Sequence, residues 1–264
     1  MRHARDPINP AWWTGAVPPG DLHRRVSRHA ALGEPVRLAI VDRLVVEDAS
    51  PGEFSSALGI PTNLLAHHLK VLTEAGLIRK ERSEGDRRRW YVRLCWEDPE
   101  VTTLVTAGGC PGPDLEGVLR VVFVCTRNSA RSPLAAAAWG RVSPIPACAA
   151  GIRPDRTLHP RAVGLARRHD LDLSGTGPHR IVDVVRPGDL VIAVCDSAHE
   201  ELCPGPGGGL CPPYARHLHW AVPDPARQDT DEAFETTFAE ILRRVGRATV
   251  ASAAQWPVEE APGA

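Results

Sequence analysis

One strand-loop-helix segment constrains the fold of this chain more than any other feature. The apolar run Val121–Val124 ends at Cys125, and after a short polar loop Arg131, Ser132 and Pro133 precede an alanine-rich stretch. This order predicts a buried strand, a tight loop and a helix. Pro133 suits the first turn of a helix, where a missing N–H has no cost.

That geometry predicts an oxyanion site. Backbone N–H groups of a loop around a helix N-terminus converge on one point, and the helix dipole adds positive charge there. The same field favours the thiolate form of Cys125. Arg131 can fork onto two anion oxygens, Ser132 can donate to the sulfur and Asn128 can brace the loop. The plain alternative is an inert strand cysteine, which the spacing of Cys, Arg and Ser disfavours.

The segment from Cys125 to Ser132 resembles the anion loop of low-molecular-weight protein tyrosine phosphatases and thioredoxin-coupled arsenate reductases. The resemblance extends over residues 119–250. It implies that the oxyanion is bound by the residues between the cysteine and the arginine: Thr126, Arg127, Asn128, Ser129 and Ala130. Arg127 stands where many relatives carry glycine, and Ala130 where many carry a second cysteine. A partner thiol must therefore come from elsewhere in the chain.

Strand and helix patterns alternate through this part of the chain. The predicted strands cover 118–125, 145–149, 190–195 and 217–222, and the predicted helices 132–141, 160–169 and 231–249. Alternation of this kind predicts a three-layer α/β unit with a parallel sheet and a ligand at the carboxyl ends of its strands. Cys125, Cys195 and Asp224 each follow a strand, so we expect them to converge on one crevice.

The resemblance also implies roles for these residues. In the phosphatases an Asp-Pro pair after the last strand supplies the general acid, and Asp224 matches it, although aspartate before proline is also a common turn former. In the arsenate reductases Cys125 would attack arsenic, Cys195 would attack Cys125 and release arsenite, and Cys203 would resolve Cys195. Cys203 stands one residue further on than in many relatives and Cys211 follows it, so the identity of the last thiol stays open. Alternatively these thiols are bystanders, or a low-molecular-weight thiol replaces them.

The first part of the chain has a compact, mostly helical pattern. Apolar residues recur at helical spacing over 22–32 and 35–46. Ser50 and Glu53 form a capping box that begins a helix ending at Leu58, and a longer helix covers 62–75. Strands over 77–82 and 88–94 flank a turn at 83–86. Two helices joined by a short turn and followed by a hairpin predict a winged helix-turn-helix, which is an α+β unit.

The stretch Leu65–Ile78 resembles the recognition helix and next strand of ArsR-family winged-helix repressors, over about residues 26–94. Leu65, Leu69 and Leu72 would face the core. Side chains on the other face and on the wing would contact DNA bases and phosphates: Thr62, Asn63, His67, Lys70, Arg87, Arg88 and Arg89. His67 and His68 could instead be plain surface residues, and the unit could serve protein contacts only. Arsenic sensors of this family often carry Cys-x-Cys in the helix before the recognition helix. This chain has no such motif there, so whether the unit senses arsenite stays open.

Composition bounds the remaining possibilities. Residues 22–96 carry 13 Lys/Arg against 9 Asp/Glu, and residues 97–264 carry 16 against 21, which suggests different partners for the two parts. Seven cysteines, an odd and unevenly spaced set, predict reduced thiols in the cytoplasm. No apolar run has membrane-spanning length or the form of a signal peptide. We expect an arm at 1–20, the winged unit at 21–96, a linker at 97–117, the α/β unit at 118–250 and a tail at 251–264.

The sequence therefore predicts a DNA-binding regulator fused to an arsenate reductase. No cofactor or metal is expected, only an external thiol reductant such as thioredoxin or a low-molecular-weight thiol. The expected partners are double-stranded DNA, arsenate or a phosphate-like oxyanion, and a second copy of the chain that pairs through the winged unit. Two alternatives belong to other classes. One is a tyrosine phosphatase fused to the same DNA-binding unit, and the other is a repressor whose anion loop senses oxyanions without catalysis.

Overall fold

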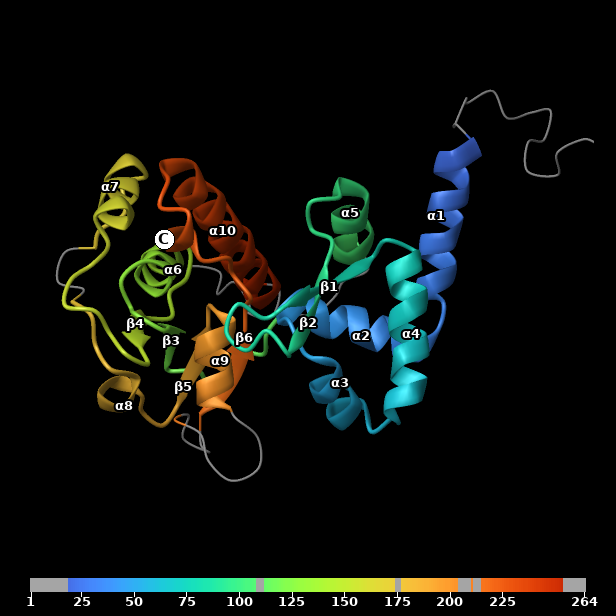
Figure 1. Ribbon diagram of the computed structural model, residues 1–264, viewed down its shortest axis with the longest axis horizontal. Helices are drawn as coiled ribbons and strands as arrows, with labels where there is room; N and C mark the ends of the chain where they lie inside the picture. Colours follow the sequence, from blue (N-terminus) through green and yellow to red (C-terminus); the bar gives the residue numbers. More distant parts are fainter. Residues whose placement is uncertain (1–18, 108–111, 174–176, 204–209, 211–214, 254–264) are drawn as a thin grey trace, which may run out of the picture.

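The computed structural model describes residues 19–107, 112–173, 177–203, 210 and 215–253. Two separate hydrophobic cores divide these residues into two units, which lie side by side (Figure 1). The first core joins buried residues between Ala31 and Val105, and the second joins buried residues between Leu115 and Ala248. Within the described residues, no helix combines the length and the apolar character needed to cross a membrane.

Capping residues determine where the helices of the first unit begin and end. The Glu34 carboxylate accepts two backbone N–H groups at the start of the second helix. Ser50 and Glu53 form the predicted capping box of the third, which ends at Gly59 with φ 63°. The helices are α1 (Pro19–Leu32), α2 (Pro35–Val46), α3 (Pro51–Leu58), α4 (Thr62–Glu74) and α5 (Pro99–Ala107). The first begins three residues before the predicted Leu22.

The hairpin of the first unit pairs β1 (Ile78–Arg82) with β2 (Trp90–Leu94) in antiparallel fashion. Its connecting loop covers residues 83–89 rather than the predicted 83–86, because Arg89 donates its N–H to the Asp86 carbonyl and closes a turn within the loop. The arginine run at 87–89 therefore lies on the loop and not on the second strand. We call residues 83–89 the wing loop.

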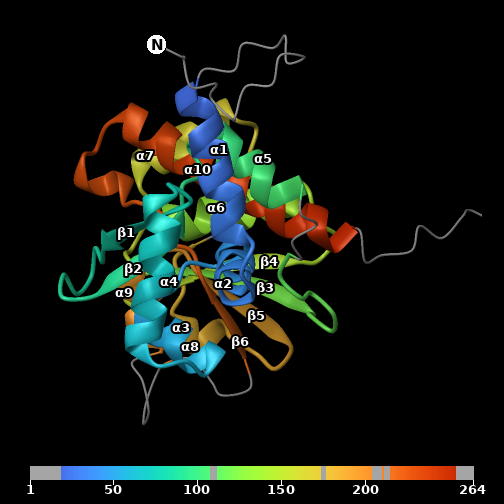
Figure 2. The ribbon, with the colours of Figure 1, turned by 90° about the vertical axis from the view of Figure 1, so that its right-hand side faces the viewer.

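Helix α5 lies within the stretch expected to be a linker. Val101 and Val105 are buried in the first core, so this helix packs on the winged unit. Arg28 of α1 forms ion pairs with Asp98 and Glu100 at the start of α5, which holds the two helices together (Figure 2). Residues 108–111, which include Cys110, lie outside the described part of the chain.

The second unit contains the predicted parallel sheet. Its strands are β3 (Arg120–Cys125), β4 (Ala147–Gly151), β5 (Asp189–Ala193) and β6 (Arg216–His219), in the order β4-β3-β5-β6. Strand β3 is central and is buried from Val121 to Cys125, as the apolar run requires. The α/β fold class is confirmed. All four strands end at the same edge of the sheet, where Cys125 pairs with Gly151.

Helices cover the sheet of the second unit (Figure 1). They are α6 (Arg131–Gly140), α7 (Pro160–Arg168), α8 (Ile181–Val184), α9 (Asp196–Leu202), the 3-10 helix η1 (Pro225–Arg227) and α10 (Asp231–Ala253). The sequence predicted α6, α7 and α10 but not α8, α9 or η1, which are too short to show an apolar period. Helix α10 continues four residues beyond the predicted end at Thr249, and residues 254–264 lie outside the described part.

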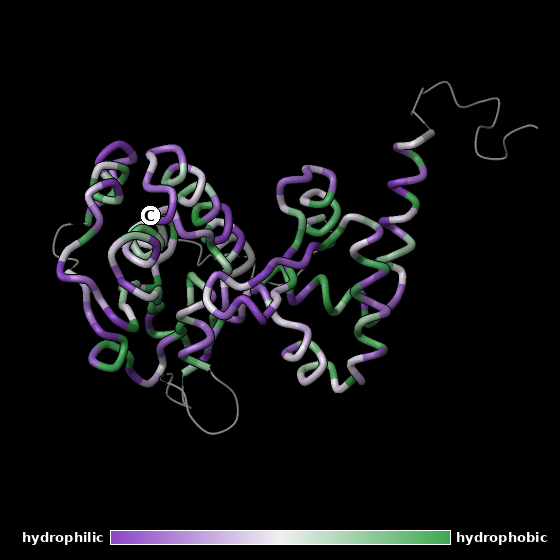
Figure 3. The backbone as a smooth tube through the Cα atoms, viewed as in Figure 1, coloured by the Kyte–Doolittle hydropathy of each residue, from purple (hydrophilic) through white to green (hydrophobic). Residues whose placement is uncertain are grey.

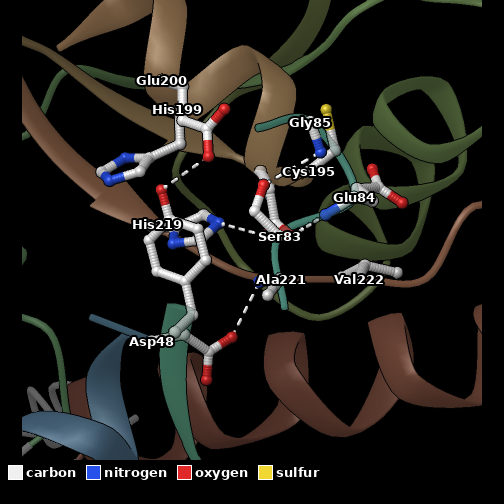
Figure 4. Close-up of polar contacts among 12 residues, drawn as sticks. Asp48, Ser83, Glu84, Gly85, Cys195, His199, Glu200, His219, Ala221 and Val222 are labelled. Atoms are coloured by element: carbon white, nitrogen blue, oxygen red, sulfur yellow. Dashed lines mark hydrogen bonds and ion pairs between the residues drawn. The ribbon is translucent and has the colours of Figure 1, made fainter. Parts of the chain in front are cut away.

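Asp48, between α2 and α3, joins the two units. Its N–H donates to the His219 carbonyl (2.8 Å), and its carboxylate accepts the Ala221 N–H (2.7 Å) and pairs with Arg244 of α10 (2.7 Å) (Figure 4). The Trp220 indole also donates to the Val46 carbonyl (3.0 Å). Hydrophilic residues predominate along the hairpin where the units meet (Figure 3). Polar interfaces of this kind are usual between domains, but here its central carboxylate is fully buried.

Candidate functional site

Cys125 lies where the anion loop joins the sheet. It ends β3, and α6 begins at Arg131 after five loop residues. The sulfur accepts the Asn128 N–H at 3.2 Å and lies 3.1 Å from the Ser132 hydroxyl oxygen. Cys125 is 3% exposed. The sulfur thus faces a backbone N–H and a hydroxyl just before the N-terminus of α6, where the helix dipole is positive.

The Ser132 hydroxyl can respond to the protonation state of that sulfur. Its oxygen accepts from the Asn128 amide (2.9 Å) and lies 3.2 Å from the Ala150 carbonyl. A hydroxyl has a single hydrogen, so it can serve either the carbonyl or the sulfur. When Cys125 is a thiol, the sulfur can donate to Ser132 and Ser132 to Ala150. When Cys125 is a thiolate, Ser132 can turn its hydrogen to the sulfur.

Asn128 braces the loop from its centre. It adopts φ 49°, a left-handed conformation that asparagine tolerates better than most residues, and it is buried. Its side-chain oxygen accepts the His179 N–H at 2.9 Å. Gly151 makes room for it, because a Cβ atom there would lie 2.9 Å from the Asn128 Cβ and 3.1 Å from the Thr126 carbonyl oxygen. The loop conformation thus depends on His179 and Gly151, which both lie outside the segment from Cys125 to Arg131.

Arg131 is buried and surrounded by acceptors. It donates to the Val222 carbonyl (2.9 Å), forms a close ion pair with Glu84 and lies 3.6 Å from Asp224. Burial alone would lower the pKa of Arg131, but the neighbouring Cys195, Glu84, Asp224 and Cys125 groups outweigh it and raise the pKa. The guanidinium is therefore a fixed positive charge at the mouth of the loop.

Asp224 is brought to the same place, as its position after the last strand predicts. Its carboxylate also accepts the Ala226 N–H at 3.2 Å and so caps η1. The turn-forming and the acid-donating interpretations of Asp224 are thus compatible. The Asp224 carboxyl group thus lies beside Arg131 and is partly open to solvent.

The other loop residues differ in exposure. Ser129 and Ala130 are buried in the loop, whereas Arg127 points outward and pairs with Asp155 at 3.1 Å. Thr126 lies against a second thiol, with 3.6 Å between its hydroxyl oxygen and the Cys195 sulfur.

Cys195 and Cys203 lie at opposite ends of α9. Cys195 is fully buried at the N-cap, where its sulfur accepts the Ala198 N–H at 3.4 Å, and burial raises its pKa to about 12 although Arg131 opposes this. Cys203 is exposed, and its sulfur lies 3.6 Å from the Nδ1 atom of His217. Burial lowers the pKa of His217, which favours the neutral form of the ring beside this thiol. Cys211 lies outside the described residues.

The recognition helix α4 has the predicted faces. Leu65, Leu69 and Leu72 are buried in the first core. The proposed base-reading side chains on the opposite face are exposed: Thr62, Asn63, His67 and Lys70. His68 differs from its neighbour, because it is buried and lies 3.3 Å from the Glu34 carboxylate. The alternative that both histidines are plain surface residues is therefore wrong for His68.

The wing loop has two faces. Arg87, Arg88 and Arg89 are exposed, and Arg88 is held by the Asp86 carboxylate at 3.0 Å. Glu84 instead reaches the second unit and pairs with Arg131. Glu84, His217 and Gly151 were not predicted from the sequence, because each contacts a residue that is distant in the chain. The length of the loop after β1 is the one local feature that could have indicated a role for Glu84.

Among the described residues, no group of His, Cys, Asp and Glu side chains has the arrangement of a metal site. The sulfur, guanidinium, hydroxyl and carboxyl groups around Cys125 can bind a tetrahedral anion, attack it as a nucleophile and protonate a leaving group.

Comparisons with known proteins agree with this geometry. Residues 120–254 match the low molecular weight phosphotyrosine protein phosphatase family, and residues 32–81 match a helix-turn-helix domain. An arsenate reductase of Oceanobacillus iheyensis is 30% identical over 131 residues, which cover 48% of this chain and 88% of the relative. An arsenate reductase of Bacillus subtilis has the same identity and coverage. Arsenate reductase 1 of Staphylococcus saprophyticus is 31% identical over 116 residues, 42% of this chain and 82% of the relative.

The predicted fusion is thus confirmed at the level of families. The two matched segments fall on the two hydrophobic cores, and the anion loop lies within the second. The chain belongs to the low molecular weight phosphotyrosine protein phosphatase family and carries a helix-turn-helix domain before its phosphatase-type unit.

Proposed function

We propose that the chain is a DNA-binding regulator fused to a thiol-dependent arsenate reductase, with Cys125 as the nucleophile. One observation carries the choice of reaction: a second thiol, Cys195, is buried against Thr126 of the anion loop. Phosphate ester hydrolysis needs no second thiol, whereas reduction of arsenate needs two electrons. The relatives of 28–31% identity that carry the name arsenate reductase support the same choice.

The reaction balances with three thiols. The Cys125 thiolate attacks arsenic, an S–As bond forms and one arsenate oxygen leaves as water. Cys195 then attacks the Cys125 sulfur, an S–S bond forms, and the electron pair of the S–As bond stays on arsenic, which leaves as arsenite. Cys203 attacks Cys195 and frees Cys125. An external thiol reductant, either thioredoxin or a low-molecular-weight thiol, reduces the Cys195–Cys203 disulfide.

Each protein group has a defined part in these steps. Asn128 and Ser132 stabilise the thiolate, and Arg131 holds the anion oxygens in a fork. Asp224 protonates the departing oxygen. The exposed Cys203 beside His217 is the thiol that a reductant can reach.

The test is arsenite production by wild type and by serine variants of Cys125, Cys195, Cys203 and Cys211. We expect Cys125→Ser and Cys195→Ser to lose catalytic turnover. Of Cys203→Ser and Cys211→Ser, only the variant that lacks the resolving thiol should lose it. Arsenite production that needs Cys125 alone would point to a low-molecular-weight thiol in place of the relay. A reduced protein that hydrolyses p-nitrophenyl phosphate briskly and never reduces arsenate would reject the proposal.

A tyrosine phosphatase is the second candidate, and the position of Asp224 beside Arg131 favours it. This carboxyl group is where a phosphatase needs its general acid. The two functions separate at Cys195, because a phosphatase with Cys195→Ser keeps its turnover and a reductase does not.

For the first unit we propose binding to double-stranded DNA in the cytoplasm as a homodimer. The exposed face of α4 and the arginines of the wing loop support this. Binding to the protein's own promoter region should weaken as salt rises, and Arg88→Ala should lower the slope of log affinity against log salt by about one. Arg156→Ala, an exposed arginine of the second unit, is the matched control. Salt-independent binding would remove the DNA-binding assignment.

A further inference from the structure

The tip of the wing loop is fixed to the second unit by its backbone. The Glu84 N–H donates to Asp196 (2.8 Å) and the Asp86 N–H to Glu200 (3.0 Å), while Arg227 donates to the Glu84 carbonyl (2.7 Å). Gly85 lies between them, and a Cβ there would lie 2.7 Å from the Glu200 carboxylate and 3.0 Å from the Ser197 Cα (Figure 4). A side chain at this position would push the Glu200 and Ser197 side chains away and crowd the α9 backbone, so glycine permits the close approach.

This anchoring directs the Glu84 carboxylate to the guanidinium of Arg131. Both side chains are largely buried, with 16% and 8% exposed. Arg131 is the residue that would grip oxyanion oxygens, and a carboxylate presents the same kind of oxygen pair to it. A cavity of about 270 Å³ opens beside this pair, between the wing and the strand ends of the second unit. Its lining includes Glu84, Asp196 and Asp224.

We propose that the helix-turn-helix unit contributes Glu84 to the oxyanion site, and that Glu84 competes with the oxyanion for Arg131. This inference rests on the oxyanion site of the proposed function. An anion arriving at the loop must displace the carboxylate, because Glu84, Asp196 and Asp224 would otherwise repel it. Burial already disfavours the charged form of Glu84 and raises its pKa, with Arg131 opposing this.

The same contact links the two units. If the wing tip and an oxyanion exclude each other on Arg131, each weakens the other by the same factor, since coupling between binding events is reciprocal. Oxyanion binding then removes the Glu84–Arg131 ion pair from the contacts that hold the tip, on the same loop that carries Arg87, Arg88 and Arg89. The state of the anion site thereby reaches the surface that is proposed to contact DNA.

The decisive measurement is the dissociation constant for inorganic phosphate, a non-reducible tetrahedral anion, by isothermal titration calorimetry on the full chain. Glu84→Gln keeps the shape and removes the charge. Asp86→Asn is the matched control, because it removes one charge from the same loop while its carboxylate contacts Arg88 and not Arg131. We expect Glu84→Gln to bind phosphate roughly ten- to hundredfold more tightly than wild type, the range of one hydrogen bond to a charged group, and Asp86→Asn to match wild type.

A second measurement uses the wild type alone. Phosphate should speed hydrogen exchange of the Glu84 and Asp86 amides, because their bonds to Asp196 and Glu200 open more often once the Glu84–Arg131 pair is lost. Unchanged phosphate affinity in Glu84→Gln, equal gains in both variants, or unchanged exchange would each overturn the competition. These outcomes leave the proposed function intact as long as Arg131→Ala abolishes phosphate binding. If neither wild type nor Glu84→Gln binds phosphate, both proposals fail.

Discussion

At the scale of single residues, the anion loop depends on the absence of a side chain at Gly151. A Cβ there would meet the Asn128 Cβ at 2.9 Å and two backbone atoms at 3.1 Å, and a backbone cannot turn aside as a long side chain can. Gly151→Ala should therefore move the loop that holds Cys125. We expect a loss of about 1–3 kcal/mol in the free energy of unfolding and about a hundredfold loss in arsenate turnover.

Gly246→Ala is the control for that change. Gly246 lies within α10, and nothing stands within 4 Å of a Cβ placed there. Gly246→Ala should raise the free energy of unfolding by up to about 1 kcal/mol, because alanine favours a helix more than glycine does. Denaturant unfolding and steady-state kinetics measure both variants. Equal turnover in the two would show that the close approach at Gly151 has no part in shaping the loop.

At the scale of elements, α9 separates the two thiols that the relay must join. Its seven residues place Cys195 and Cys203 at opposite ends, about 12 Å apart at the helical rise. A disulfide needs Cα atoms within about 7 Å, so oxidation must unwind α9. We expect the His199 and Cys203 amides, which bond carbonyls at 3.1 and 2.9 Å, to lose protection from hydrogen exchange in the oxidised protein.

The Cys203→Ser variant, treated with the same oxidant, should keep that protection. Because Asp196 and Glu200 of α9 anchor the wing tip, the Glu84 amide should lose protection together with the helix. Full protection of α9 in a protein with a proven Cys195–Cys203 bond would contradict this geometry, and the resolving thiol would then be sought at Cys211.

The elements that the sequence predicted are those with local signals. The apolar period, the Ser50 capping box and the glycine stops located α2, α3 and α4 nearly to the residue, and the β-branched runs located β3 and β5. Helix α9 escaped because it is short and its cap is a cysteine, Cys195, which is an uncommon N-cap residue. The Cys125 loop could be predicted because Asn128 and Ser132 contact the sulfur from within seven residues, whereas its contacts with His179 and Gly151 could not.

At the scale of the whole molecule, prediction from sequence stopped at the interface. Glu84 meets Arg131 across 47 positions and Asp48 meets Arg244 across 196, and no periodicity carries such information. The contacts are also polar, so the interface could not be predicted from an exposed apolar stripe. The charge difference between the two parts did indicate unlike surfaces, and these surfaces meet through Arg93, Glu240 and Arg244.

That ion cluster makes the docking of the two units dependent on pH. Glu240 pairs with Arg244 (2.7 Å) and lies 3.6 Å from Arg93 of the first unit. Burial by itself would raise the pKa of Glu240, but Arg244, Arg243 and Arg93 outweigh it and lower the pKa from 4.5 to about 2. A depressed pKa means that the folded state favours the charged form. The resulting stability is complete above pH 4.5 and is lost as the pH falls toward 2.

The charged Glu240 carboxylate should contribute about 3 kcal/mol to the free energy of unfolding, from the change in its pKa. Urea unfolding of wild type and Glu240→Gln across pH 2–6 measures it. The variant should be less stable near pH 6, because Arg244 and Arg93 each lose one negative partner and keep another. Its stability should fall less steeply between pH 4.5 and 2. Asp231→Asn, at the exposed start of the same helix, is the control and should follow the wild-type curve more closely. Parallel curves for wild type and Glu240→Gln would show that this pair contributes nothing to holding the units together.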